Sequence, residues 1–253
     1  MMKDMQYPIN HQLTTKPASM FLTSTHYLTD RWAAPNPLTP CSLEVVGYMK
    51  RILILGSSGS GKSTLARRLG ATLELPVIHL DRHYWQPGWV PTPEMEWVET
   101  VNQIIQRPQW IIDGNYRSTL DIRLQAADTI VFLDLPPWLC ALRATKRRIQ
   151  YANTPRPDMA KGCRERLFDP QFPEFIRHIW TYPNRARPDV KKRLANYSSD
   201  KEIIWLKTTD DVSQFLSEPL NPKFCQQHSW NGRQNGTYLN HTTSTSQISK
   251  KSS

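Results

Sequence analysis

We predict an α/β fold built on a doubly wound, five-stranded parallel sheet. Short apolar segments alternate with helical segments through residues 49–217, and this alternation is typical of parallel sheets covered by helices on both faces. The first apolar segment, residues 52–55, leads directly into a glycine-rich turn and a helix. Aspartates follow three of the later segments, at positions 81, 113 and 134. Because ligands bind at the carboxyl ends of parallel strands, we expect a site at that edge of the sheet.

The five predicted strands are short. They are expected at residues 52–55, 76–80, 110–112, 129–133 and 203–206. Helices are expected at residues 63–69, 93–106, 138–151, 174–180, 185–196 and 210–216. Thr92 is interpreted as the N-cap of the second helix, with Pro93 at its first position and two acidic residues in its first turn. A loop-rich stretch at residues 152–173 separates the third and fourth helices, and residues 151–185 are predicted to form a lid region with helical parts.

The composition of the chain divides it into three regions. Residues 49–217 are predicted to form one folded domain, which is long enough for a single core. Residues 1–48 and 218–253 are polar and lack helical or strand periodicity, so both are predicted to be disordered. Met49 directly precedes the first strand and resembles a natural chain start. We therefore interpret residues 1–48 as an optional extension or an over-long reading of the gene, rather than a functional arm.

The glycine-rich turn has the pattern G-x-x-x-x-G-K-[ST], which binds phosphate in nucleotide-binding proteins. Glycines let the backbone turn its N–H groups inward, and the following helix adds the positive end of its dipole. Lys62 can reach the outer phosphates, and the Ser63 hydroxyl can bind Mg²⁺. A flexible linker would not lie between a strand and an amphipathic helix. The predicted binding residues are Gly56, Ser57, Ser58, Gly59, Ser60, Gly61, Lys62, Ser63 and Thr64.

Two aspartates at strand ends are candidate catalytic residues. Asp113 lies where a carboxylate could order the waters of Mg²⁺ together with Ser63, and Asp81 lies where a phosphoryl acceptor could be held. The alternative is that each aspartate only caps the next turn or helix. For Asp134, a functional role and a purely structural one stay equally open.

Basic residues are concentrated in the second half of the predicted domain. The chain has a net charge of +10, and residues 141–193 contain fourteen Lys and Arg against five Asp and Glu. Arg143 and Arg147 share one helix face and could stabilise the charge of a transferring phosphoryl group. Such a surface fits a lid over a nucleoside triphosphate, or a contact with nucleic acid. We favour the lid, because basic and aromatic residues are not regularly interleaved.

Other residue types suggest neither a metal centre nor a membrane span. His79 and His83 flank Asp81 but have no third ligand at suitable spacing, so we interpret them as structural or substrate-side. The four cysteines share no short spacing, which predicts a reducing compartment. We find no long apolar run and no signal-peptide core, so a cytoplasmic protein without membrane contact is expected. Trp85 and Trp89 are interpreted as packing residues beneath an acceptor pocket, with ring stacking as the alternative.

These motifs together resemble those of the nucleoside monophosphate kinases, adenylate kinase included. That group has D-G-F-P-R where this chain has D-G-N-Y-R, at residues 113–117. Three stretches resemble the FlaR-like family of P-loop NTPases, usually labelled DNA topology modulation proteins: H-L-D-R-H-Y-W-Q-P-G-W at 79–89, I-I-D-G-N-Y at 111–116 and R-P-D-M-A-K-G-C at 156–163. The resemblance covers nearly all of residues 49–216. It implies an ATP-binding, kinase-like fold with strand order 2-3-1-4-5, and an acceptor-phosphate contact at Arg117.

Two function classes therefore compete. In the first, the chain is a kinase that uses ATP and Mg²⁺ to phosphorylate a small-molecule or nucleotide acceptor, with Lys62, Asp81, Asp113 and Arg147 in catalysis and Arg143 and Arg147 at the nucleotide. In the second, it is an ATP-dependent DNA-binding or regulatory protein that uses residues 141–193. A GTP switch is disfavoured, because the sequence has no N-K-x-D segment that would read guanine.

Overall fold

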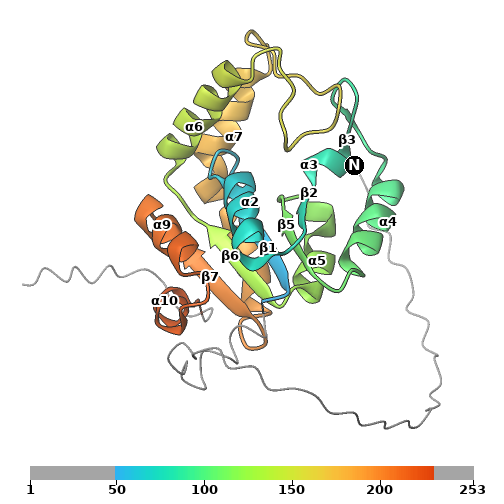
Figure 1. Cartoon of the computed structure of the whole chain (residues 1–253). Coiled ribbons are helices and arrows are strands. Elements are labelled where there is room, and N and C mark those ends of the chain that lie inside the picture. Colours follow the sequence, from blue (N-terminus) through green and yellow to red (C-terminus); the bar gives the residue numbers. More distant parts are fainter. Residues whose placement is uncertain (1–48, 231–253) are drawn as a thin grey trace, which may run out of the picture. The chain divides into compact units, whose positions relative to one another are not determined.

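A computed structural model describes residues 49–230 of the chain. The domain contains a five-stranded sheet in the order β2-β5-β1-β6-β7 (Figure 1). All neighbouring strands are parallel. The strands are β1 (Arg51–Gly56), β2 (Val77–His79), β5 (Trp110–Asp113), β6 (Thr129–Leu133) and β7 (Glu202–Leu206). Among the strands of this sheet the order is 2-3-1-4-5, so the predicted fold class is confirmed.

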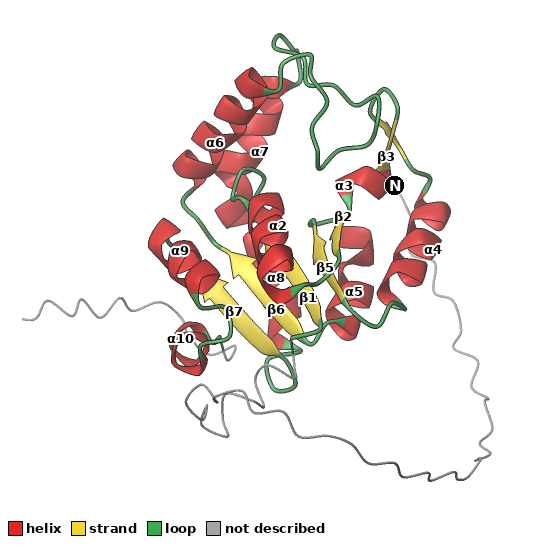
Figure 2. Ribbon diagram, in the orientation of Figure 1, coloured by secondary structure: helices red, strands yellow, loops and turns green. Residues whose placement is uncertain are grey.

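Helices cover both faces of this sheet (Figure 2). On one face, residues that alternate along the strands pack against three helices: α2 (Lys62–Leu73), α9 (Thr209–Ser217) and α10 (Pro222–His228). The other face packs against α4 (Glu94–Ile105), α5 (Leu120–Ala126) and α8 (Arg187–Ala195). Because side chains alternate between the faces of a strand, β1 sends Ile52 and Ile54 to the first core and Leu53 and Leu55 to the second. The uninterrupted apolar runs of the sequence are the consequence of this double burial.

The remaining elements lie at the carboxyl-terminal edge of the sheet. Helices α6 (Pro137–Gln150) and α7 (Phe172–Arg185) pack on one another through a smaller apolar cluster. The loop between them extends toward a short hairpin formed by β3 (Trp85–Gln86) and β4 (Val90–Pro91) (Figure 1). A one-turn helix, α3 (Asp81–Tyr84), and a 3₁₀ turn, η1 (Arg117–Thr119), complete the described elements. No helix within residues 49–230 is long and apolar enough to cross a membrane.

The start of α4 corrects one local prediction. Pro93, not Thr92, is the N-cap residue of this helix, and it provides no side-chain cap. The Thr92 hydroxyl instead donates a hydrogen bond to the Tyr84 carbonyl at 2.6 Å. Thr92 is buried, so its hydroxyl must find a partner within the fold, and the backbone of α3 provides the acceptor. The residue therefore ties the end of α3 to the start of α4.

The predicted boundary at residue 217 is also corrected. Residues 218–230 are not a disordered tail: α10 buries Phe224 and Cys225 in the core, and Trp230 contacts Trp205 with ring centroids 5.2 Å apart. The Trp230 N–H also donates to the Ile203 carbonyl of the edge strand β7. The prediction of a disordered tail failed because few apolar residues, among them the buried Phe224, Cys225 and Trp230, attach this mostly polar stretch to the sheet near its edge strand β7. The extension at 1–48 and the rest of the tail at 231–253 lie outside the described residues.

We predict that Trp230→Ala lowers the free energy of unfolding by about 3 kcal/mol, because it removes a buried aromatic ring and leaves a cavity. The control is Trp180→Ala, since Trp180 is 59% exposed. Urea denaturation of both variants tests this. Equal stabilities would contradict the packing of residues 218–230 on the sheet.

Candidate active site

The glycine-rich turn forms a loop with the geometry of an anion-binding site. Gly56 and Gly59 have φ angles of +147° and +79°, and a Cβ at Gly59 would lie 2.1 Å from the Cys140 carbonyl oxygen of α6. Helix α2 then begins at Lys62, and its N-cap residue Gly61 offers no side chain to the first N–H groups of the helix. Free N–H groups at a helix N-terminus attract anions. The loop therefore fits a phosphate chain.

Lys62 folds back over this loop. Its Nζ atom donates to the carbonyl oxygens of Gly56 and Ser57, each at 2.9 Å. Burial lowers its pKa, while the nearby Asp113 and Asp81 act in the opposite direction. A buried ammonium group held only by backbone carbonyls is free to exchange them for phosphate oxygens.

Asp113 joins three elements at the end of β5. One carboxylate oxygen accepts a hydrogen bond from the Ser63 hydroxyl at 2.7 Å, and the other lies 2.5 Å from Nδ1 of His79. The strand register explains the second contact, because His79 and Asp113 are direct neighbours on β2 and β5. The predicted Mg²⁺ ligands Ser63 and Asp113 are thus brought together, and His79 fixes the orientation of the carboxylate.

Asp81 is the first residue of the one-turn helix α3 and interacts electrostatically with Lys62. Its carboxylate accepts a hydrogen bond from the Tyr116 hydroxyl at 2.6 Å. Burial raises the pKa of Asp81, and the Tyr116 hydrogen bond, Lys62 and Arg156 oppose this shift. A partly buried carboxylate with a raised pKa near the lysine of the phosphate loop is suited to accept a proton.

The arginines of α6 divide into two groups. Arg143 donates from Nη1 to the Ser60 carbonyl of the loop at 3.3 Å. The Nε atom of Arg147 is buried without a hydrogen-bond partner, and burial lowers the pKa of this side chain. Arg148 points elsewhere, donating to Asp169 and to the Arg166 carbonyl. Arg143 therefore contacts the loop, Arg147 interacts electrostatically both with Lys62 and with carboxylates of the lid, and Arg148 supports the lid.

The predicted residues of the phosphate loop do not all have equal access to a ligand. Ser57 and Ser60 are buried, and the hydroxyl of Ser60 has no hydrogen-bond partner. Thr64 is exposed in the first turn of α2. The unpaired Ser60 hydroxyl and Arg147 Nε are polar atoms that a bound phosphate chain could satisfy, so these residues fit ATP with Mg²⁺. No cluster of three or more His, Cys, Asp or Glu suited to a metal ion occurs among residues 49–230.

The lid loop, residues 151–171 between α6 and α7, contacts the hairpin formed by β3 and β4. The Trp89 indole donates to the Arg164 carbonyl at 3.1 Å, and the Cys163 thiol contacts the Gln86 carbonyl at 3.2 Å. Trp85 and Trp89 pack edge to face with centroids 5.6 Å apart, as expected for a packing pair. Buried ion pairs centred on Arg156 hold the loop, rather than helices of its own.

Asp134 and Arg117 have partners away from the phosphate loop. Asp134 accepts hydrogen bonds from Arg187 at 3.3 Å and from the Trp205 indole at 3.2 Å, which indicates a structural role. Arg117, which the family resemblance implies as an acceptor-phosphate contact, pairs with Asp189 at 3.1 Å and is largely exposed.

Sequence reasoning missed two residues that shape the site. Asn115 bonds the backbone of Gly56 twice: its Nδ2 donates to the carbonyl at 2.7 Å, and its Oδ1 accepts from the N–H at 3.2 Å. Arg123 is fully buried and donates to the carbonyls of Gly114, Asn115, Tyr116 and Thr119. Its position on the apolar face between Leu120 and Leu124 is the signal that could have revealed it.

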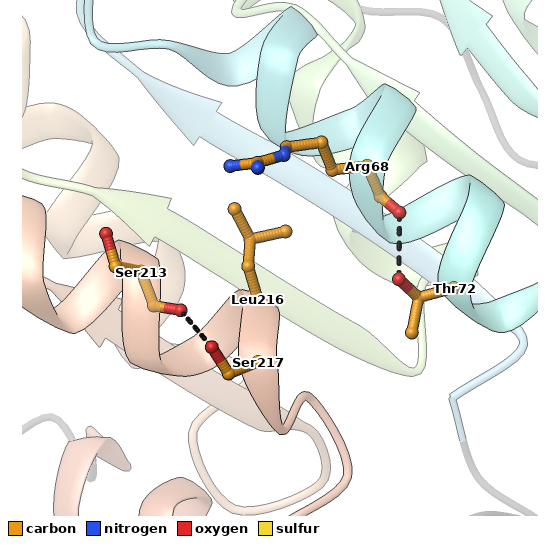
Figure 3. A pocket seen from close by; sticks show the side chains of 5 residues that line it. All are labelled: Arg68, Thr72, Ser213, Leu216 and Ser217. Atoms are coloured by element: carbon orange, nitrogen blue, oxygen red, sulfur yellow. Dashed lines mark hydrogen bonds between the residues drawn. The ribbon is translucent and has the colours of Figure 1, made fainter.

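Two hollows lie around these elements. One, of about 200 Å³, adjoins the phosphate loop and is lined by Ser57, Ser58, Asn115, Arg117 and residues of α7. Its lining is mostly apolar. Another, of about 410 Å³, lies between α2 and α9 and contains no candidate site residue (Figure 3). Its hydroxyl groups, on Thr72, Ser213 and Ser217, bond to carbonyls of their own helices, so we assign it no role.

The sheet order and the phosphate loop define a P-loop protein with a nucleoside monophosphate kinase-like fold. Among solved structures, a shikimate kinase from Acinetobacter baumannii is similar, with a TM-score of 0.47 and 16% identity over 71% of this chain and 98% of that one. A gluconokinase from Sinorhizobium meliloti 1021 gives a TM-score of 0.41 and 15% identity, with 71% and 93% covered. A shikimate kinase from Bacteroides thetaiotaomicron gives 0.40 and 18%, with 67% and 96% covered.

No protein-family model matches the sequence, and no curated protein matches it. The structural similarities are distant, and the function is therefore inferred from the residues of the site.

We predict that Arg123→Met lowers the free energy of unfolding by about 3 kcal/mol, because buried carbonyls lose their donors while the apolar volume is kept. Arg67→Met, at an exposed position of the helix α2, is the control. Thermal or chemical denaturation measures both. A stable Arg123 variant would show that Arg123 does not hold residues 114–119.

We also predict that Tyr116→Phe raises the pKa of Asp81 further, because the Tyr116 hydrogen bond favours the ionised carboxylate. Titration of the Asp81 carboxyl carbon by NMR in both proteins measures this shift. The other groups that act on Asp81, namely Lys62, Asp113 and Arg156, are unchanged by the substitution. A midpoint that stays in place or moves to lower pH would contradict the hydrogen bond.

Proposed function

We propose that this protein is a kinase that transfers the γ-phosphoryl group of ATP to a small-molecule or nucleotide acceptor. The observation that carries the proposal is the convergence of Lys62, Asp113, Asp81 and Arg147 on one phosphate loop. Electrostatic interaction links Lys62 with each of the other three. A protein that only binds nucleotide needs the loop and a metal ligand, but it has no use for a second, partly buried carboxylate that interacts with the lysine.

Each side chain has a role that follows from its position. The loop and Lys62 hold the phosphates, while Ser63 and Asp113 would hold Mg²⁺, which neutralises phosphate charge when bound. Arg143 and Arg147 stabilise the negative charge of the group in transfer. Asp81 orients the acceptor beside them. The lid loop excludes water, which limits loss of ATP by hydrolysis.

The resemblance to the FlaR-like family supports the same assignment. Its three stretches meet in the fold: His79 contacts Asp113, Asp81 contacts Tyr116, and Trp89 contacts the lid just beyond residue 163. Sequence segments far apart in the chain thus build one site around the phosphate loop.

The competing function, ATP-dependent DNA binding, loses support from the pairing of basic residues. Arg148, Arg156, Arg187 and Arg193 of the segment 141–193 are engaged with carboxylates. Charge that is neutralised within the fold adds little to binding of a phosphate backbone.

Transfer from γ-labelled ATP to compounds of a metabolite extract tests the proposal. The wild-type chain is expected to label an acceptor, and Lys62→Ala is expected to abolish the labelling because the phosphates lose their buried cation. If the protein binds ATP and shifts duplex DNA with a steep salt dependence, but labels no acceptor, it is instead a nucleic-acid-binding protein.

Two substitutions on α6 distinguish a catalytic role of Arg147 from the general effect of losing one positive charge. We predict that Arg147→Gln lowers kcat by about 10²-fold or more, since an arginine that stabilises transferring charge is lost. Lys146→Gln removes the same charge from the exposed adjacent position and should leave kcat unchanged. Steady-state ADP formation measures both. Equal rates in the two variants would remove Arg147 from the catalytic group.

A further inference from the structure

We propose that the acceptor is an uncharged molecule that is phosphorylated on a hydroxyl group, rather than a nucleotide or other compound that already carries a phosphate. The proposal rests on the proposed kinase function and specifies its substrate class. It follows from which groups the lysine and arginine side chains around the phosphate loop already bind.

The buried arginines of the lid are neutralised by carboxylates of the lid itself. Arg156 donates from Nη1 to Glu165 at 2.8 Å and from Nη2 to Asp158 at 2.7 Å. Arg148 bonds Asp169 at 2.8 Å, and its other Nη atom lies 3.7 Å from Glu165. Neither arginine is available to bind an acceptor phosphate without breaking a buried ion pair.

The described residues that line the hollow beside the phosphate loop include no unpaired lysine or arginine. Arg117 is the one Lys or Arg among the residues that line it, and Arg117 is paired with Asp189. The lining instead includes the buried hydroxyl of Tyr182, which has no hydrogen-bond partner. An unpaired hydroxyl in a mostly apolar hollow suits a neutral polar ligand better than a phosphate.

Within the described part of the chain, the cations that remain free at the site are required by the donor. Lys62 and Arg143 donate to backbone carbonyls of the phosphate loop, and the Nε atom of Arg147 is buried without a hydrogen-bond partner, although Arg147 also interacts electrostatically with Glu165 and Asp158. The phosphates of bound ATP would engage these three cations, which leaves none of them for a second phosphate. The other basic side chains of the lid, Lys161, Arg164 and Arg166, and Arg82 of α3 are exposed, where ion pairs contribute little.

Asp81 adds a second, chemical argument. A phosphate acceptor would bring more negative charge next to a buried carboxylate, which is unfavourable, whereas a hydroxyl acceptor gains from it. In the step that we propose, the hydroxyl oxygen forms a bond to the γ-phosphorus and gives its proton to Asp81. The bond from the γ-phosphorus to the bridging oxygen breaks, and ADP leaves with that electron pair. A phosphate acceptor is already ionised and needs no such base.

The test uses the full chain with γ-labelled ATP, Mg²⁺ and two acceptor sets. One is the uncharged fraction of a metabolite extract after anion exchange, together with nucleosides, hexoses and polyols. The other is the phosphate-bearing fraction, together with AMP, CMP, GMP and UMP. We expect label to enter the uncharged set at least about tenfold faster than the phosphate-bearing set.

The possible outcomes distinguish a wrong acceptor class from a wrong kinase function, on which the inference rests. Labelling of the phosphate-bearing set at an equal or higher rate overturns the inference but supports a kinase. Labelling of neither set, with ATP bound or hydrolysed to inorganic phosphate, overturns both. Asp81→Asn should lose transfer while still binding ATP, whereas Asp210→Asn, an exposed position of α9, should retain both.

Discussion

The site depends on one constraint, the attachment of the chain after β5 to the phosphate loop after β1. Parallel pairing places Asp113 beside Ile54, two residues before the loop begins. From there Asn115 bonds both backbone groups of Gly56, and Asp113 bonds Ser63 beyond the loop. The loop is therefore held at its first residue and just after its last glycine. A loop of glycines and serines has high conformational entropy, so these contacts preorganise it for phosphate.

The segment that makes these contacts, residues 114–119, is itself held in place by Arg123. The residues after Tyr116 turn at once into η1. Arg123 donates to the carbonyls of this turn from a fully buried position. The cost of burying a guanidinium group is offset because each of its nitrogens meets a carbonyl oxygen. Arg123 thereby holds Tyr116 where its hydroxyl donates to Asp81, so the shape of the turn affects the chemistry of the site.

The lid uses charge for a different purpose. Arg156 is 7% exposed and Glu165 is 8% exposed, so their pairing brings little net stability compared with apolar packing. It does fix one arrangement of a loop that has no helix or strand of its own. The lid thereby lies on the hairpin at Trp89 and Gln86, while the Nε atom of Arg147 has no hydrogen-bond partner. Specific positioning, rather than stability, is what this cluster contributes.

The alternation of strands and helices and the phosphate loop could be predicted from the sequence, because apolar runs, helix periodicity and glycine spacing are local signals, whereas the strand order was implied only by the family resemblance. The same pattern placed Gly56, Asp81, Asp113 and Asp134 at one edge, since parallel strands share their carboxyl ends. Only the tertiary structure decided which charged groups are free. Arg147 and Arg148 are adjacent in sequence, yet Arg148 is paired with Asp169 whereas the Nε atom of Arg147 is buried without a hydrogen-bond partner. Partners such as Asp169 for Arg148, Asp189 for Arg117 and Trp205 for Trp230 are distant along the chain, and contacts of this kind are fixed by packing rather than by any local pattern.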